Sequence, residues 1–251
     1  MAKNDVLPGA EAFYFEGSEV GCVVSHGFTG TTQSMRFLGE YLSKEGGLTV
    51  IGPRLTGHGS TPEEMATATA EDWIRDIERA AENLRPRCSK VFITGLSMGG
   101  TLTLYMAAMH PDIFLGAAPI NAAIFLENPD FAALAFSPKA PSTIPGVSAD
   151  IKKPGVFELA YPVIPVPCLR QLYVLVTVTR ELLPRVLCPT LVFQAREDHV
   201  VKPENAPFIM ERLGAKDKKL VWLDESYHVS TLDNDKEFIA REILKFIRAH
   251  L

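Results

Sequence analysis

Cysteine is scarce in this sequence, and the few cysteines are widely separated. The chain has four cysteines in 251 residues, and none of them forms a Cys-x-x-Cys pair. Disulfide-dependent domains are rich in cysteine, and structural zinc sites need closely spaced ligands. We therefore expect neither a disulfide framework nor a structural zinc site.

An excess of basic residues is also missing. Twenty-five Lys and Arg residues face thirty Asp and Glu residues, which gives a formal net charge of −5. Because no basic patch stands out, we expect no nucleic-acid partner. Residues 1–11 form a short, polar and already acidic start, unlike a secretory signal peptide, which favours a cytoplasmic protein.

Formal charge is absent from residues 91–111, a run long enough to span a bilayer. The run nevertheless contains glycines and hydroxyl residues, and it ends in His110-Pro111. A buried strand, a glycine turn and a buried helix explain it better, because parallel strands are covered on both faces. We expect no transmembrane segment.

Strand-like and helix-like segments alternate along most of the chain. Of its residues 47% are hydrophobic and 22% charged, as in an average soluble domain. The predicted strands are 20–25, 48–53, 90–94, 114–121, 190–195 and 219–223. The predicted helices are 34–45, 70–84, 98–109, 203–213 and 236–250. This alternation predicts a single α/β domain with a mostly parallel central sheet and helices on both faces.

The alternation breaks between residues 122 and 186. This segment is rich in proline and has scattered apolar residues but no clear strand–helix unit. We interpret it as an insertion of short helices and loops within the one domain of residues 1–251.

The strongest local motif is the run GLSMGG at residues 95–100, between a predicted strand and a predicted helix. A Gly-x-Ser-x-Gly turn in this context holds its serine on a sharply bent backbone above the sheet, at a helix N-terminus. The pattern also arises by chance, but both flanks agree with the motif. We predict Ser97 as the nucleophile of a covalent mechanism.

A serine nucleophile needs a base, and the sequence offers six histidines. In this architecture the acid and the base follow the serine, on loops after the late strands. His228 follows the last predicted strand and is the expected base. Asp198 follows the preceding strand and is favoured as the acid over its neighbour Glu197, whereas Asp224 is too close to His228 in sequence.

An oxyanion needs two N–H donors. The residue after the serine, Met98, supplies one backbone N–H in such sites. The loop HGFTG (26–30) follows an early strand, and the backbone N–H of Phe28 is the expected second donor. We also expect the Phe28 ring to line an acyl pocket.

These motifs resemble the serine α/β-hydrolase family, and within it the small bacterial monoacylglycerol lipases and related carboxylesterases. The matching runs span nearly the whole chain. They are HGFTGTTQSMR (26–36), PRLTGHG (53–59), GLSMGGTLTLY (95–105), PINAA (119–123), EDHVV (197–201) and SYHVSTLD (226–233). The resemblance implies the triad Ser97, Asp198 and His228, the oxyanion donors Phe28 and Met98, and a reaction without metal or cofactor.

The resemblance also gives the inserted segment a meaning. It implies that residues 122–186 form a small cap over the site, with Glu158 binding the glycerol hydroxyls of a monoacylglycerol. After Tyr161 the chain departs from the family pattern, since three prolines stiffen the stretch 162–167. The apolar cap residues suit a greasy substrate and transient contact with a lipid surface, although they could equally pack the cap onto the sheet.

The sequence also allows two other functions. A general carboxylesterase for short or medium acyl esters would use the same machinery with a different pocket. A non-catalytic ligand receptor would share the fold, but an intact triad and oxyanion loop argue against it. The sequence makes no prediction about the oligomeric state.

Overall fold

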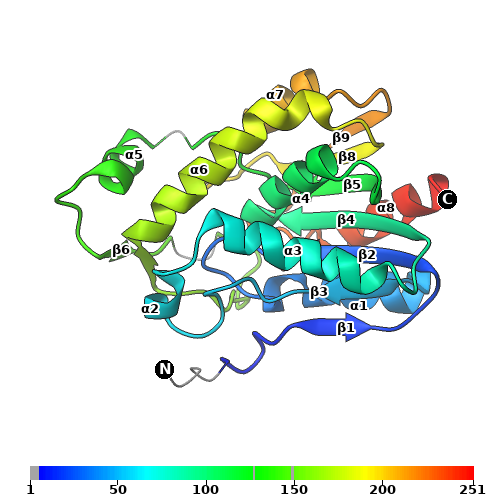
Figure 1. Ribbon diagram of the computed structural model, residues 1–251, viewed down its shortest axis with the longest axis horizontal. Helices are drawn as coiled ribbons and strands as arrows, with labels where there is room; N and C mark the ends of the chain where they lie inside the picture. The colour runs from blue at the N-terminus through cyan, green and yellow to red at the C-terminus, as the bar shows by residue number, and fades with distance from the viewer. Residues whose placement is uncertain (1–5, 127, 148–149) are drawn as a thin grey trace.

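A seven-stranded sheet forms the centre of the structure, a computed structural model that describes residues 6–126, 128–147 and 150–251 (Figure 1). Its strand order is β1-β3-β2-β4-β5-β8-β9; β1 is antiparallel to β3, and the other neighbours are parallel. The strands are β1 (Phe13–Phe15), β2 (Val20–Ser25), β3 (Thr49–Gly52), β4 (Lys90–Leu96), β5 (Phe114–Ile120), β8 (Thr190–Ala195) and β9 (Lys218–Leu223). The predicted mostly parallel sheet is confirmed.

Helices cover both faces of this sheet. Helices α1 (Gln33–Gly46) and α8 (Lys236–Ala249) bury their apolar sides in one cluster. Helices α3 (Ala70–Leu84), α4 (Met98–Met109) and α6 (Val166–Leu182) contribute to the cluster on the opposite face. The short helices α2 (Pro62–Met65) and α7 (Asn205–Arg212) complete the layers.

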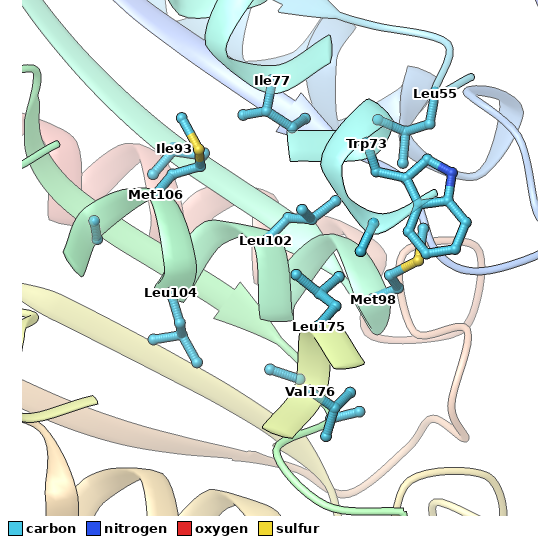
Figure 2. Close-up of a cluster of buried hydrophobic side chains, with 14 of the residues drawn as sticks. Leu55, Trp73, Ile77, Ile93, Met98, Leu102, Leu104, Met106, Leu175 and Val176 are labelled. Carbon is cyan, nitrogen blue, oxygen red and sulfur yellow. The ribbon is translucent and has the colours of Figure 1, made fainter. Parts of the chain in front are cut away.

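Alternate residues of the central strands enter opposite clusters. In β2, Val23 faces the α3–α4 side, while Cys22 and Val24 face the α1–α8 side. Figure 2 shows the α3–α4 side of the sheet, where Trp73 of α3, Leu102 of α4 and neighbouring side chains pack together. Full burial of such a side chain contributes about 1.5–3 kcal/mol. Burial on both faces explains why these strands are apolar throughout.

The charge-free run of residues 91–111 forms β4 and α4 in the interior. Ten of the twelve residues of α4 are buried, as is typical of a helix that is apolar all round and lies inside a protein. Within the described ranges, no helix is both long and apolar enough to cross a membrane.

The inserted segment differs from the expectation of short helices and loops. It contains α5 (Pro129–Phe136), β6 (Thr143–Pro145), β7 (Val163–Pro165), the 17-residue α6 and the 3₁₀ turn η1 (Leu183–Arg185). Helix α6 packs against α3 and α4, so it belongs to the layer on the sheet. The β-branched run VLVTVT (174–179) conceals its helical spacing, and Pro167 is tolerated because the first turn needs no N–H partner.

The remaining differences from the sequence prediction are small. The helix expected from residue 203 begins at Asn205, and the four-residue α2, β1 and the antiparallel β6–β7 pair were not expected. These three strands have three residues each, too few to display a period.

The topology gathers the expected site residues at one edge of the sheet. Parallel strands end at the same edge, and ligands of open α/β sheets bind there. Phe28 follows β2, Ser97 follows β4, Asp198 follows β8 and His228 follows β9.

Candidate active site

Ser97 lies in a strained turn between β4 and α4. Its φ of 57° and ψ of −117° lie in a region that side chains other than glycine rarely adopt, at a cost of about 1–3 kcal/mol. The backbone N–H of Ser97 donates to Ile120 O at 2.9 Å, which holds the turn against β5. Strain that the surrounding structure sustains is typical of a functional position.

The flanking glycines make this turn sterically feasible. A Cβ on Gly95 would lie 2.4 Å from Gly99 O, and a Cβ on Gly99 would lie 2.3 Å from Ser25 O. Both contacts are with backbone atoms that have little freedom to move. The Gly-x-Ser-x-Gly spacing therefore reflects close packing of the turn against β2.

Ser97 opens into a cavity of about 420 Å³. The polar side chains of His228 and Glu158 also line the cavity, as do Phe28 and Met98. Apolar residues from α5, β7 and α6 and from the chain leading to α5 line it too, among them Phe125, Leu126, Phe131, Ile164, Leu169 and Leu172. An apolar cavity with a few converging polar groups is typical of a small-molecule site.

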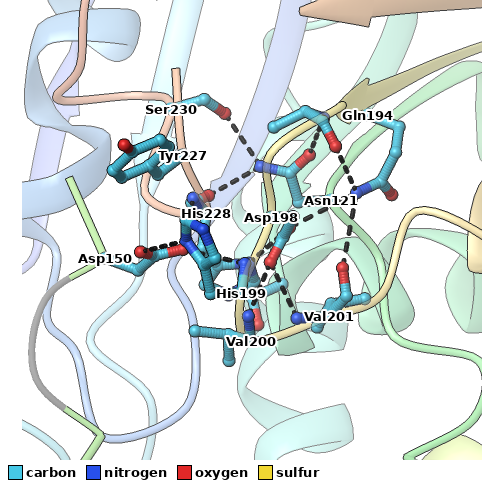
Figure 3. Close-up of polar contacts among 12 residues, drawn as sticks. Asn121, Asp150, Gln194, Asp198, His199, Val200, Val201, Tyr227, His228 and Ser230 are labelled. Carbon is cyan, nitrogen blue, oxygen red and sulfur yellow. Dashed lines mark hydrogen bonds and ion pairs between the residues drawn. The ribbon is translucent and has the colours of Figure 1, made fainter. Parts of the chain in front are cut away.

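His228 and Asp198 form a buried pair (Figure 3). The ring nitrogen Nδ1 of His228 lies 2.8 Å from Asp198 Oδ2, and the Asp198 side chain is fully enclosed. A carboxylate only accepts hydrogen bonds, so Nδ1 carries the proton and a neutral ring keeps its lone pair on Nε2. This tautomer suits His228 for accepting a proton at Nε2.

The Asp198 carboxylate is held by several donors. Its Oδ1 accepts from the backbone N–H groups of Val200 and Val201 at 2.9 and 2.8 Å, and its Oδ2 also accepts from Gln194 Nε2 at 3.3 Å. These bonds fix the carboxylate in the orientation that faces His228.

The pKa of His228 lies above its usual value. Burial by itself lowers the pKa of the ring, but the charge and hydrogen bond of Asp198 raise it, with further raising contributions from Glu158 and Asp150. The hydroxyl of Ser97 makes no hydrogen bond to His228 in the described chain, although both groups line the cavity.

The neighbouring acidic and basic residues have other partners. Glu197 is exposed and pairs with Lys152 at 2.8 Å, and Asp224 pairs with Arg196 at 2.8 Å. His199 bonds Asp150 through its ring, also at 2.8 Å. Of the two adjacent carboxylates that the sequence offered, Asp198 is therefore the one that contacts His228.

The loop 26–30 brings Phe28 beside the serine. Phe28 and Met98 both line the cavity, and neither backbone N–H donates to another residue in the described part of the chain. Both N–H groups are thus free to bind an oxyanion. The Phe28 ring packs edge-on against Trp73, with ring centres 5.9 Å apart.

His26 supports this loop, a role that the sequence did not suggest. Its Nε2 accepts from Leu55 N at 3.1 Å, and its Nδ1 bonds Gly27 O at 2.9 Å. Full burial lowers the pKa of His26 to about 4, so the ring is neutral and bonds with both nitrogens. His26 therefore joins the Phe28 loop to the chain after β3.

Glu158 comes from the inserted segment and lines the cavity without a hydrogen bond to any other described residue. A Cβ on Gly30 would lie 2.6 Å from Glu158 Oε1, so the glycine allows the carboxyl group its place. Burial raises the pKa of Glu158 to about 7, and the charge of His228 partly opposes this rise. An unpaired acid in a cavity is available to bind a polar ligand.

No sequence motif predicted the roles of two further polar residues of the site. Asn121, in the run PINAA, bonds the loop of His228, and Asp150 bonds the backbone of both His199 and His228. No sequence period marks such residues, because their partners are 49 to 107 residues away. Among the described residues, no group of three or more His, Cys, Asp and Glu is placed to hold a metal ion.

Known proteins resemble this chain along nearly its whole length. The sequence model of the Alpha/beta hydrolase family matches residues 22–241. The chain is 46% identical to the thermostable monoacylglycerol lipase of Bacillus sp. (strain H-257), covering 98% of this chain and 97% of the relative. It is 29% identical to the carboxylesterase of Bacillus subtilis (strain 168), covering 94% and 95%.

A solved structure from work on LipS and LipT, two metagenome-derived lipolytic enzymes, is also similar. It is 56% identical in sequence, covers 98% of this chain and 100% of its own, and superposes with a TM-score of 0.96.

Proposed function

Because the chain belongs to the alpha/beta hydrolase family, we propose that it is a serine hydrolase that cleaves carboxylic esters. Its favoured substrate is monoacylglycerol, which it splits into glycerol and a free fatty acid. The observation that carries this proposal is one apolar cavity. It is lined by Ser97, by the imidazole of His228, which is bonded to Asp198, and by the unpaired carboxyl group of Glu158.

The first half of the reaction forms an acyl-enzyme. Ser97 Oγ attacks the ester carbonyl carbon while His228 Nε2 takes the hydroxyl proton. Asp198 holds the Nδ1–H tautomer and stabilises the imidazolium without being protonated itself. When the tetrahedral intermediate collapses, the bond from carbon to the glycerol oxygen breaks, and His228 returns the proton to that oxygen.

The second half releases the fatty acid. A water molecule gives a proton to His228 Nε2 and attacks the acyl carbon, and the bond to Ser97 Oγ breaks as the proton returns to the serine. In both halves the N–H groups of Phe28 and Met98 stabilise the oxyanion. Loss of one such donor typically lowers the rate by about 10²–10³.

The cavity lining supports an amphiphilic substrate. The segment 122–186 supplies the cap in this proposal, with α6 at its base in the layer on the sheet, and its apolar residues, with the Phe28 ring, bind the acyl chain. Glu158 binds the glycerol hydroxyls, since its carboxyl group is the unpaired polar group of the cap within the described cavity lining.

Direct labelling tests the proposed function. We expect a fluorophosphonate probe to modify wild-type protein at Ser97, and Ser97→Ala to lose both labelling and nearly all ester turnover while keeping its melting temperature. Wild-type-like turnover by Ser97→Ala would refute the proposal. An unlabelled wild-type protein would favour the non-catalytic receptor.

The second candidate is a general carboxylesterase, favoured by the similarity to a Bacillus subtilis carboxylesterase. Glu158→Ala separates the two, with turnover measured on a monoacylglycerol and on a short p-nitrophenyl ester. At a pH above the acid limb of His228, to whose pKa Glu158 contributes, we expect a loss of roughly tenfold or more on the glycerol ester alone, as for one hydrogen bond to a charged group. Equal effects on both esters would favour the general esterase. Glu82→Ala, on the exposed side of α3, is the control.

The location and surface contacts belong to the same proposal. The four cysteines are unpaired, which supports a reducing compartment such as the cytoplasm. Phe157 is 79% exposed beside Glu158, and Val147 lines the cavity while remaining 47% exposed. These side chains support transient contact with a lipid surface during substrate uptake.

A further inference from the structure

Asp150 links the acid and the base of the proposed triad from outside both loops (Figure 3). One oxygen, Oδ2, accepts from the backbone N–H of His199 at 3.0 Å and from the backbone N–H of His228 at 3.1 Å. The other oxygen, Oδ1, bonds the Nδ1 of the His199 ring at 2.8 Å. Since His199 directly follows Asp198, a single carboxylate oxygen joins the two loops that must keep Asp198 and His228 in contact.

Asp150 is itself held firmly in place. Its carbonyl oxygen accepts from Val229 N at 3.0 Å. Beyond it, the buried carboxylate of Asp233 accepts from Lys152 N and Lys153 N at 2.6 and 2.9 Å, and also from Tyr227 N at 2.9 Å. Asp150, in the inserted segment, thus binds the backbone N–H of His228 in the loop after β9. In return, Asp233 in that loop binds backbone N–H groups of the inserted segment.

We propose that Asp150 is a positioning residue for catalysis, which sets the separation of the Asp198 and His228 loops and places a negative charge beside the imidazole. The inference rests on the proposed ester hydrolysis. Asp150 acts through the backbone of His228 and does not touch the reacting atoms. Its role therefore differs from that of Asp198, which bonds the ring itself.

Three carboxyl groups act on the imidazole from two parts of the chain. Asp198 comes from the loop after β8, whereas Glu158 and Asp150 come from the inserted segment, and each raises the pKa of His228. His199, next to Asp150, and Tyr227 carry further titratable rings nearby, and these two rings meet edge-on with centres 4.6 Å apart. Removing the charge of Asp150 should therefore lower the pKa of His228.

A purely structural role for Asp150 predicts a different outcome. If the carboxylate only anchors the inserted segment, its replacement lowers the melting temperature and leaves the kinetics of correctly folded molecules unchanged. A positioning role changes kcat for those molecules and moves the pH profile.

The test compares Asp150→Asn with the charge-retaining Asp150→Glu. Rates are normalised to the fraction of protein labelled at Ser97 by a fluorophosphonate. For Asp150→Asn we expect kcat on a soluble ester to fall roughly tenfold to hundredfold, the scale of a small misplacement of catalytic groups, with little change in KM. The acid limb of kcat/KM should move to lower pH. Asp150→Glu should keep the acid limb at its wild-type pH but lose kcat.

Glu197→Gln is the matched control. It removes an exposed carboxylate adjacent to Asp198 that does not contribute to the pKa of His228, so its profile should match the wild type. An unchanged kcat and acid limb in normalised Asp150→Asn would overturn the inference. If that variant does not fold, an unchanged kcat in Asp150→Glu overturns it. Failure of the proposed function would instead leave the wild-type protein unlabelled by the fluorophosphonate, so the two failures can be told apart.

Discussion

The side-chain amide of Asn121 donates a 2.6 Å hydrogen bond to the backbone carbonyl oxygen of His228, 107 residues away in the sequence. The same nitrogen donates to Ser230 Oγ at 3.0 Å, and Oδ1 accepts from Ala195 N at 2.8 Å. Asn121 thus joins the end of β5 to the end of β8 and to the loop of the proposed base. The backbone φ of Asn121 is 46°, and its side chain is fully buried among these partners.

Loss of these bonds should cost stability and activity together. We expect Asn121→Ala to lower the free energy of unfolding by about 1–3 kcal/mol for each buried partner left unsatisfied. Chemical denaturation and kcat measure the two effects. Asn121→Gly tolerates the positive φ, so a similar loss in that variant assigns the effect to the side-chain bonds. The exposed Asn234→Ala is the control, and equal behaviour of all three variants would contradict the prediction.

The raised pKa of His228 predicts the acid limb of the activity profile. The neutral ring is the active form, and its negative neighbours keep it protonated to a higher pH than usual. We expect kcat/KM on a soluble ester to rise with pH with a midpoint above about 6.5, the ordinary value for histidine. A midpoint below that value would show that burial outweighs the attraction of Asp198. The Glu158→Gln variant removes the second group that titrates near neutral pH, and it should also lower the midpoint, because Glu158 contributes to the raised pKa of His228.

Glu158 should make the protein less stable as it ionises. The pKa of this carboxyl is raised to about 7 in the folded chain, from about 4.5. Its contribution to stability is therefore present below the lower value and is lost as the pH rises through the higher one. We expect Glu158→Gln to melt at a higher temperature than the wild type at pH 8, with a smaller difference at pH 5. A difference independent of pH would contradict the raised pKa.

The close packing of the serine turn predicts intolerance of a methyl group. In Gly99→Ala the new Cβ would lie 2.3 Å from Ser25 O, so β2 or the turn must shift. We expect this variant to lose fluorophosphonate labelling of Ser97, or to lose the native fold, as followed by circular dichroism. Gly155→Ala places its Cβ where nothing lies within 4 Å and meets only the cost of a positive φ. Labelling of Gly99→Ala at the wild-type rate would show that the turn adapts.

Much of this site was predictable because its reactive residues lie just after the ends of parallel strands. The Gly-x-Ser-x-Gly run marked Ser97, and the order of the late loops marked Asp198 and His228. The structure brings Asp198 and His228 together and places Ser97 and Glu158 in the same cavity. Helix α6 escaped prediction because its β-branched run resembles a strand, and its helical face becomes evident only against α4.

The sequence by itself determined the parallel sheet, the buried charge-free run and the motif residues, since burial and backbone geometry restrict residue types at short, regular spacings. Tertiary structure decided which of Glu197 and Asp198 faces the histidine, because adjacent side chains point in different directions and the fold selects one. It also decided the roles of Asn121 and Asp150. Their hydrogen bonds join residues that are 49 to 107 positions apart in the sequence. These contacts form only once the strands have assembled, so no local sequence pattern predicts them.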